Sequence, residues 1–114
     1  MKKYIVTVLG TAYAVKIIPT DMDKQLRKCD GYCDEDMKRI VVDDLTDYDC
    51  YEAAARDRRV KQNIRHELIH AFLFESGLGH NFEHKPIGHE ETIVDWIALM
   101  LPKINDACRK CDAL

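Results

Sequence analysis

The chain has 114 residues, of which 46% are hydrophobic and 32% are charged. This size and composition suit one globular domain, residues 1–114, and not a disordered tail. A formal net charge of -3 argues against a nucleic-acid partner, which would call for a basic face. No apolar run approaches the roughly 18 residues that span a membrane, and the run after Lys2 and Lys3 is too short for an export signal. We therefore expect a cytoplasmic protein with no membrane association. The sequence leaves its oligomeric state open.

The N-terminal part of the chain predicts two β-hairpins. Residues 4–9 and 12–18 are rich in β-branched and aromatic side chains, and Gly10 lies between them. Residues 31–34 then lead through a polar turn to residues 39–43, which are the more convincing strand of the second pair. We expect these hairpins to form a small antiparallel sheet.

A long helix follows, from about Glu52 to Ser76. Asp49 with Glu52 three residues later is typical of a capping box at a helix start. Apolar side chains then recur at four-residue steps, which is the pattern of a helix with one buried face; they are Val60, Ile64, Leu68 and Phe72. Gly77 stands where a helix commonly ends.

The C-terminal part predicts further helix. One helix is expected from about Glu90 to Leu101, with Trp96 on its core face. Pro102 should break it, and residues 103–112 should form a last short helix. Strands followed by helices predict an α+β fold, with the sheet packed against the long helix.

The long helix contains His66-Glu67-Leu68-Ile69-His70, an HExxH motif. Positions four apart share one helix face, so His66 and His70 can reach one metal ion. Glu67 then lies beside the metal, where a carboxylate can take a proton from a bound water. The competing interpretation is an amphipathic helix that carries two surface histidines.

Two histidines do not complete a catalytic zinc site, which normally has three protein ligands and an open position. Residues 89–95 open the second helix after a glycine-bearing loop, so this segment can fold back on the motif. Within it, Glu91 and Asp95 are four residues apart and share a helix face. Glu90 and His89 remain alternative third ligands.

The Glu91-x-x-x-Asp95 arrangement resembles the gluzincin metallopeptidases such as thermolysin. On that resemblance Glu91 is the third zinc ligand and Asp95 accepts the free ring N–H of a ligating histidine. The chain also resembles the small ImmA/IrrE-type metallopeptidases of phages and mobile elements. The resemblance lies in residues 65–72, in Glu91, and in residues 94–102, which end in Leu-Pro. This second resemblance implies a minimal zincin-like fold and a zinc-dependent metallo-endopeptidase encoded by a phage or prophage.

The implied mechanism is metal-assisted hydrolysis of a protein or peptide substrate. Zinc lowers the pKa of its water to roughly 7, and Glu67 takes the proton and later hands it to the leaving amine. The donor to the oxyanion stays open among His80, His84, His89 and the tyrosines elsewhere in the chain. Residues 39–43 are expected to offer a sheet edge to the substrate. The alternative function is a catalytically silent zinc-binding interaction protein on a peptidase-like fold.

Five cysteines are present, and without an export signal we expect them to be reduced. A second, structural zinc site is the less favoured alternative. It would combine Cys29 and Cys33 with Cys108 and Cys111.

Overall fold

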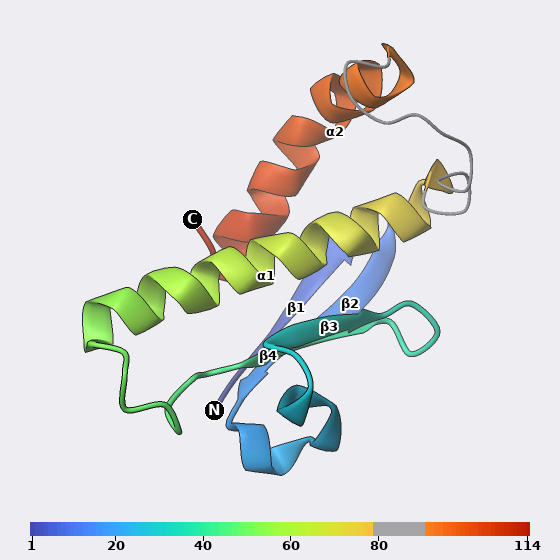
Figure 1. The fold of residues 1–114 in the computed structure, drawn as a ribbon. Coiled ribbons are helices and arrows are strands. Elements are labelled where there is room, and N and C mark those ends of the chain that lie inside the picture. The colour runs from blue at the N-terminus through green and yellow to red at the C-terminus, as the bar shows by residue number, and fades with distance from the viewer. Residues whose placement is uncertain (79–90) are drawn as a thin grey trace.

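The computed structural model describes residues 1–78 and 91–114; for five residues near the start of the last helix (Glu91, Thr92, Val94, Asp95 and Ala98) it describes the backbone alone. The chain forms a four-stranded sheet and two α-helices, and Figure 1 shows that the helices lie on one face of the sheet. The strands are β1 (Lys2–Val8), β2 (Thr11–Ile18), β3 (Gly31–Asp34) and β4 (Arg39–Asp43), in the order β1-β2-β4-β3. The expected α+β class is confirmed.

The two expected hairpins both form. β1 pairs antiparallel with β2, and the turn between them has Leu9 at φ 49° and Gly10 at φ 89°. Positive φ at both turn residues is typical of the type I′ turn that suits a two-residue hairpin. β3 pairs antiparallel with β4, and the Asp34 carboxylate accepts from the backbone N–H groups of Asp36 and Met37, each at 3.1 Å.

The prediction of a wholly antiparallel sheet is wrong, because β2 and β4 are parallel, with Ala14 opposite Arg39 and Ile18 opposite Asp43. The chain between them passes through two short 3-10 helices, Thr20–Met22 and Lys24–Arg27, and through β3. This crossover brings β4 beside β2 in the same direction. The prediction that residues 39–43 form a sheet edge is also wrong. β4 is the most completely buried strand and takes a central position, which leaves β1 and β3 as the edges.

Helix α1 (Ala53–Glu75) is the predicted long helix. Its N-cap is Glu52, with no side-chain hydrogen bond to the first turn, so the expected capping box from Asp49 is wrong. The C-terminal end agrees with the sequence. The Ser76 N–H donates to the Phe72 carbonyl at 3.0 Å, and Gly77 has a φ of +80°, which is the left-handed conformation that ends many helices.

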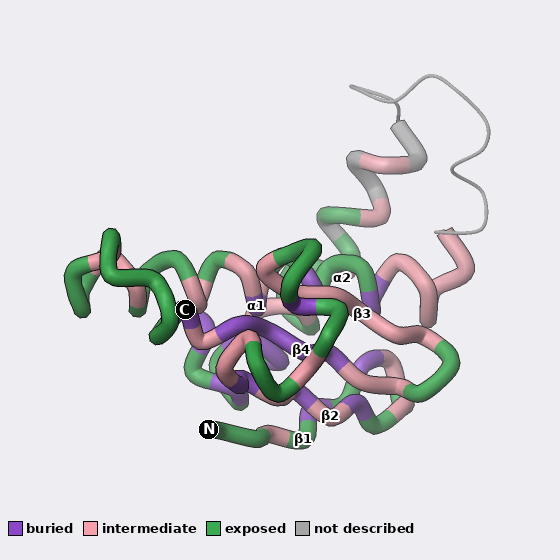
Figure 2. The backbone as a smooth tube through the Cα atoms, turned by 60° about the horizontal axis from the view of Figure 1, so that its bottom comes forward, coloured by how far each residue is buried: buried purple, intermediate pink, exposed green. Residues whose placement is uncertain are grey.

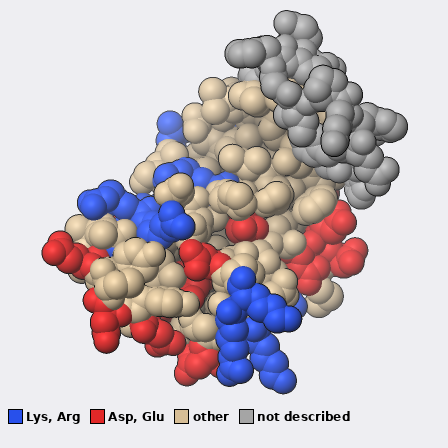
Figure 3. Space-filling model, in the orientation of Figure 1, with Lys and Arg blue, Asp and Glu red and all other residues tan. Residues whose placement is uncertain are grey.

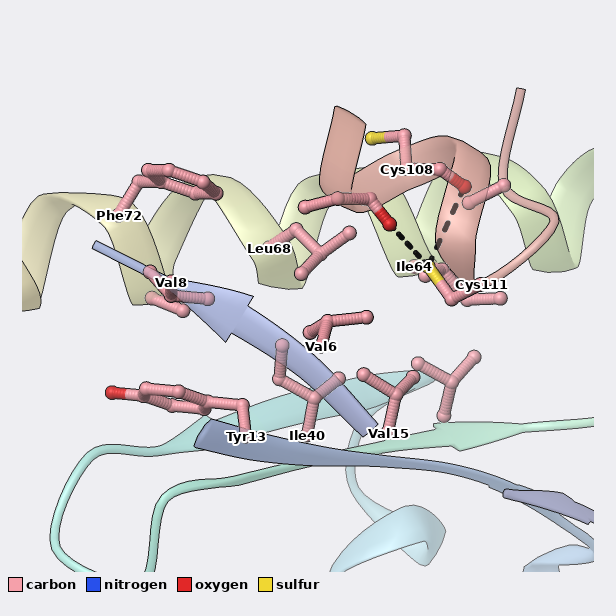
Figure 4. Close-up of a cluster of buried hydrophobic side chains, with 14 of the residues drawn as sticks. Val6, Val8, Tyr13, Val15, Ile40, Ile64, Leu68, Phe72, Cys108 and Cys111 are labelled. Carbon is pink, nitrogen blue, oxygen red and sulfur yellow. Dashed lines mark hydrogen bonds between the residues drawn. The ribbon is translucent and has the colours of Figure 1, made fainter. Parts of the chain in front are cut away.

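The hydrophobic core lies between the sheet and the two helices (Figure 4). From the sheet it takes Val6, Val8, Tyr13, Val15 and Ile40; from α1 it takes Ile64, Leu68, Ala71 and Phe72. The purple segments in Figure 2 follow the sheet and the side of α1 that faces it. Phe72 is fully buried and Trp96 packs against the same cluster, as expected for core residues.

Helix α2 runs without interruption from Glu91 to Lys110, with Pro102 inside it. The predicted break at Pro102 is therefore wrong. A proline removes one backbone donor from a helix, but the residues beyond it have strong reason to stay helical. Ala107, Cys108 and Cys111 are all at most 2% exposed in the core. In the part of the chain that the structure describes, neither helix is long and apolar enough to cross a membrane.

Candidate metal centre

The two histidines of the HExxH motif lie next to each other on the outer flank of α1. The Nε2 atoms of His66 and His70 are 3.2 Å apart, and the ring centroids are 4.9 Å apart. Both side chains are exposed. The four-residue spacing therefore does what the sequence predicted: it brings two imidazole nitrogens to one point on the helix surface.

The separation of these nitrogens fits a zinc ion. Two imidazole nitrogens at about 2.0–2.1 Å from a tetrahedral zinc lie about 3.3 Å from each other, close to the 3.2 Å found here. Burial, and then the nearby His66, lower the pKa of His70 below its usual value. A lowered pKa suits a ligand, because a metal-bound histidine must be deprotonated. Without a metal, the same contact is a hydrogen bond between the two rings, in which the tautomers decide which nitrogen donates.

Glu67 points away from solvent, into the gap between α1 and β3. It is 7% exposed, and its Oε1 lies 3.9 Å from His66 Nε2. Burial raises the pKa of the Glu67 carboxyl, while the nearby His66 partly opposes this shift. A raised pKa makes a carboxylate a stronger base, as a general base requires.

Two residues of β3 form the surroundings of Glu67, and sequence reasoning missed both. A Cβ on Gly31 would lie 3.1 Å from the Val41 carbonyl oxygen and 3.5 Å from Glu67 Cγ. Glycine thus lets the strand approach closely enough to cover the carboxylate. Cys33 faces the same side, and burial followed by the Glu67 charge raises the pKa of its thiol to about 12. Side chains alternate between the two faces along a strand, so Gly31 and Cys33 face the same side. Only the position of β3 beside α1 shows that this side faces Glu67.

A polar cavity of about 270 Å³ adjoins the motif on the side of the N-terminal half of α1. Its walls include Arg59, Asn63, His66 and Glu67 from α1, with Asp30 and Gly31 from the β3 side. The candidate metal centre therefore opens onto a space that another molecule can enter.

The C-terminal end of α1 is tied to the sheet by Glu75. Its carboxylate accepts hydrogen bonds from Tyr13 Oη at 2.8 Å, from Thr11 Oγ1 at 3.1 Å and from Lys38 Nζ at 2.7 Å. These donors come from β2 and from the β3–β4 turn. Glu75 lies five residues after His70 on the same helix. These three hydrogen bonds therefore hold the HExxH motif in position above β3. No sequence motif indicated these three hydrogen bonds.

The remaining predicted site residues fall outside what the structure describes. These are His80, His84, His89 and Glu90, and the side chains of Glu91 and Asp95. Among the described side chains, no three of His, Cys, Asp or Glu are placed to hold a metal ion. A hydrogen bond of 3.0 Å from Trp96 Nε1 to Ser76 Oγ holds the second turn of α2 at the C-terminal end of α1.

The cysteines do not assemble into the alternative four-cysteine site. All five are free: Cys29 is exposed, whereas Cys108 and Cys111 are buried in the core under α2. The Cys111 thiol donates to the Ala107 carbonyl at 3.3 Å, and burial raises its pKa to about 11. These two thiols act as small apolar core groups.

No protein-family model matches this chain, and no curated protein and no solved structure is significantly similar to it. The functional argument therefore depends on the geometry of the site itself.

Proposed function

We propose that this protein is a zinc-dependent metallo-endopeptidase of the minimal zincin type, related in design to the small ImmA/IrrE-type enzymes of phages and prophages. One observation carries the proposal. The His66 and His70 ring nitrogens lie 3.2 Å apart with the buried Glu67 carboxylate 3.9 Å from the nearer ring. Two surface histidines on an amphipathic helix would have no reason to meet each other beside a buried acid.

His66 and His70 are two of the zinc ligands, and Glu91 is the third by its resemblance to the gluzincin pattern. Asp95 accepts a ring N–H from one of the histidines and so fixes its tautomer. Two imidazoles and one carboxylate are a donor set that suits zinc. When bound, zinc supplies Lewis-acid chemistry and lowers the pKa of a water molecule to about 7.

Glu67 is the general base. Its carboxyl, with a pKa raised by burial, accepts a proton from the attacking water and then delivers that proton to the leaving amine. Gly31 and Cys33 cover it on the β3 side. This covering explains why the acid of the motif is buried while the two histidines remain exposed.

The substrate is an extended protein or peptide segment that adds to β3. This strand is an outer strand of the sheet, so one row of its backbone N–H and C=O groups is not used by β4. An exposed edge is a ready template for strand addition. Because a Cβ on Gly31 would lie 3.5 Å from Glu67 Cγ, a segment paired with β3 passes close to the general base.

The test is cleavage of a peptide mixture by the zinc-loaded protein, with products read by mass spectrometry. We expect Glu67→Gln to retain zinc and to lose hydrolysis by about 100-fold or more, the usual size of a general-base contribution. Glu52→Gln is the matched control, since it makes the same change at the exposed N-cap residue of α1. Unchanged cleavage by Glu67→Gln would overturn the role given to Glu67.

The second candidate is a zinc-binding interaction protein without turnover. Exposed apolar side chains on both helices favour it: Ile69 is 42% exposed between the two histidines, and Ile97 and Leu101 on α2 are 49% and 50% exposed. Such side chains are typical of protein-binding surfaces. A partner that the zinc-loaded protein retains at full length through a long incubation would favour this function.

A further inference from the structure

The cavity beside the motif carries polar groups that the hydrolytic mechanism does not use. Arg59, Gln62 and Asn63 line it from α1, and Asp30 lines it from the loop that enters β3. Arg59 and Asn63 precede Glu67 by two turns and one turn of the same helix, so they lie along one flank with it. The cavity is thus continuous with the site of the general base.

Two of these side chains are donors without a strong acceptor. The Arg59 side chain is 47% exposed, and its Nη2 lies 3.8 Å from Asp30 Oδ2, in a pair between two half-exposed groups. Such pairs are weak and leave the guanidinium available to another carboxylate. Asn63 Nδ2 is buried and has no hydrogen-bond partner in the described part of the chain. A buried amide donor normally has one.

The direction of β3 decides which part of a substrate would reach this cavity. Asp30 lies beside Arg59, Gly31 lies against Glu67, and the turn after β3 places Lys38 on Glu75. β3 therefore runs in the same direction as α1. Antiparallel pairing is the more stable mode of strand addition. A peptide paired in that way passes Glu67 and then continues, towards its carboxyl end, past Asp30 and Arg59.

The surface charge also differs between the two ends of the path that such a peptide would follow along β3. Figure 3 shows basic side chains gathered over the N-terminal half of α1, and acidic side chains at the opposite end by the β3–β4 turn. The end of β3 and the turn carry Asp34, Glu35 and Asp36 with Lys38, while the first turns of α1 carry Arg56, Arg58 and Arg59 with Asp57, so the balance is acidic at one end and basic at the other. A bound peptide would meet a positive field on its carboxyl-terminal side.

We propose that Arg59 and Asn63 form a specificity subsite for an acidic side chain located on the carboxyl-terminal side of the scissile bond. Arg59 pairs with the carboxylate, and the Asn63 amide donates to it as a neutral second donor. Both are positioned to act on substrate recognition and not on bond cleavage itself. This assignment rests on the proposed peptidase function, because it takes Glu67 as the reference point for the scissile bond.

The experiment uses zinc-loaded full-length protein and a randomised decapeptide mixture, with cleavage positions read by mass spectrometry. Binding is measured beside it by fluorescence polarisation of two labelled peptides that differ only by Asp or Asn at one position. Arg59→Gln is expected to reduce the preference for acidic residues after the cut by about tenfold, the size of one charge-assisted hydrogen bond. Arg59→Glu should favour Lys at that position. Arg58→Gln is the matched control, because it removes the same charge from an exposed neighbour that does not line the cavity.

The outcomes separate this inference from the proposed function. One outcome supports both the subsite and the peptidase function: the wild type cleaves with a preference for acidic residues, Arg59→Gln loses this preference, and Arg58→Gln keeps it. Cleavage without such a preference overturns the subsite and leaves the peptidase intact. Tighter binding of the Asp peptide that depends on Arg59, without any cleavage, supports the subsite and overturns the peptidase. Neither cleavage nor selective binding overturns both.

Discussion

Glu75 gives the sharpest stability test of how the motif helix is held. Its carboxylate accepts from Tyr13 Oη at 2.8 Å, and Tyr13 is fully buried. Glu75→Ala leaves that hydroxyl without an acceptor, which costs about 1–3 kcal/mol. Thr11 is half-buried and can turn to water, so it adds little. We expect the free energy of unfolding to fall by about 2 kcal/mol.

Urea unfolding followed by circular dichroism measures this loss. With a denaturant slope of about 1–3 kcal/mol per molar urea, the midpoint should move down by about 1 M. Tyr13→Phe in the Glu75→Ala background removes the orphaned hydroxyl and should recover part of the loss, since removing both partners costs less than removing one. A shift within error for Glu75→Ala, or a double variant no more stable than the single one, would refute the reasoning.

The contribution of Glu75 to the free energy of unfolding should depend on pH. The hydrogen bond from Lys38, and then those from Tyr13 and Thr11, hold the pKa of Glu75 below its usual value. A carboxyl with a lowered folded-state pKa stabilises the fold above its unfolded pKa of about 4.3. The stability gap between wild type and Glu75→Ala should be constant at neutral pH and should shrink as pH falls through the folded pKa.

Three further predictions concern the site and the core beneath it. Glu67→Gln should stabilise the metal-free protein at neutral pH, because the pKa of Glu67 is raised by burial; thermal unfolding at several pH values should show the gain growing as pH rises from about 4, where the wild-type carboxyl is neutral in both states. Gly31→Ala should lower the free energy of unfolding by about 1–3 kcal/mol, because its Cβ would lie 3.1 Å from the Val41 carbonyl oxygen; an unchanged urea midpoint would contradict the close approach of β3. Leu68→Ala, at a fully buried position, should cost about 3 kcal/mol in the same assay, whereas a loss below about 1 kcal/mol would place Leu68 outside the packed core.

The local parts of the fold could be predicted from the sequence, because the signals that specify them are local. Gly10 marks the first hairpin, and the four-residue apolar repeat through Ile64 and Phe72 marks the motif helix and its buried face. The contact between His66 and His70 follows from helix geometry alone. None of these features depends on how distant segments pack.

The non-local parts could not be predicted. The sequence of residues 39–43 does not indicate that this strand pairs with β2 in parallel and therefore lies in the middle of the sheet. Pro102 is an ordinary stop signal until the burial of Cys108 and Cys111 beyond it is known. Likewise, the contacts of Gly31 with Glu67 depend on where α1 crosses the sheet. Tertiary packing overrides local preference at each of these positions.

The most direct test of the central claim is zinc content, measured by mass spectrometry on purified protein after zinc reconstitution. The wild type should bind about one zinc per chain, and His70→Ala should lose it. Cys108→Ala, which removes a buried thiol from the core, is the control and should retain it. Zinc absent from the wild type, or retained in full by His70→Ala, would contradict a metal centre at the HExxH motif.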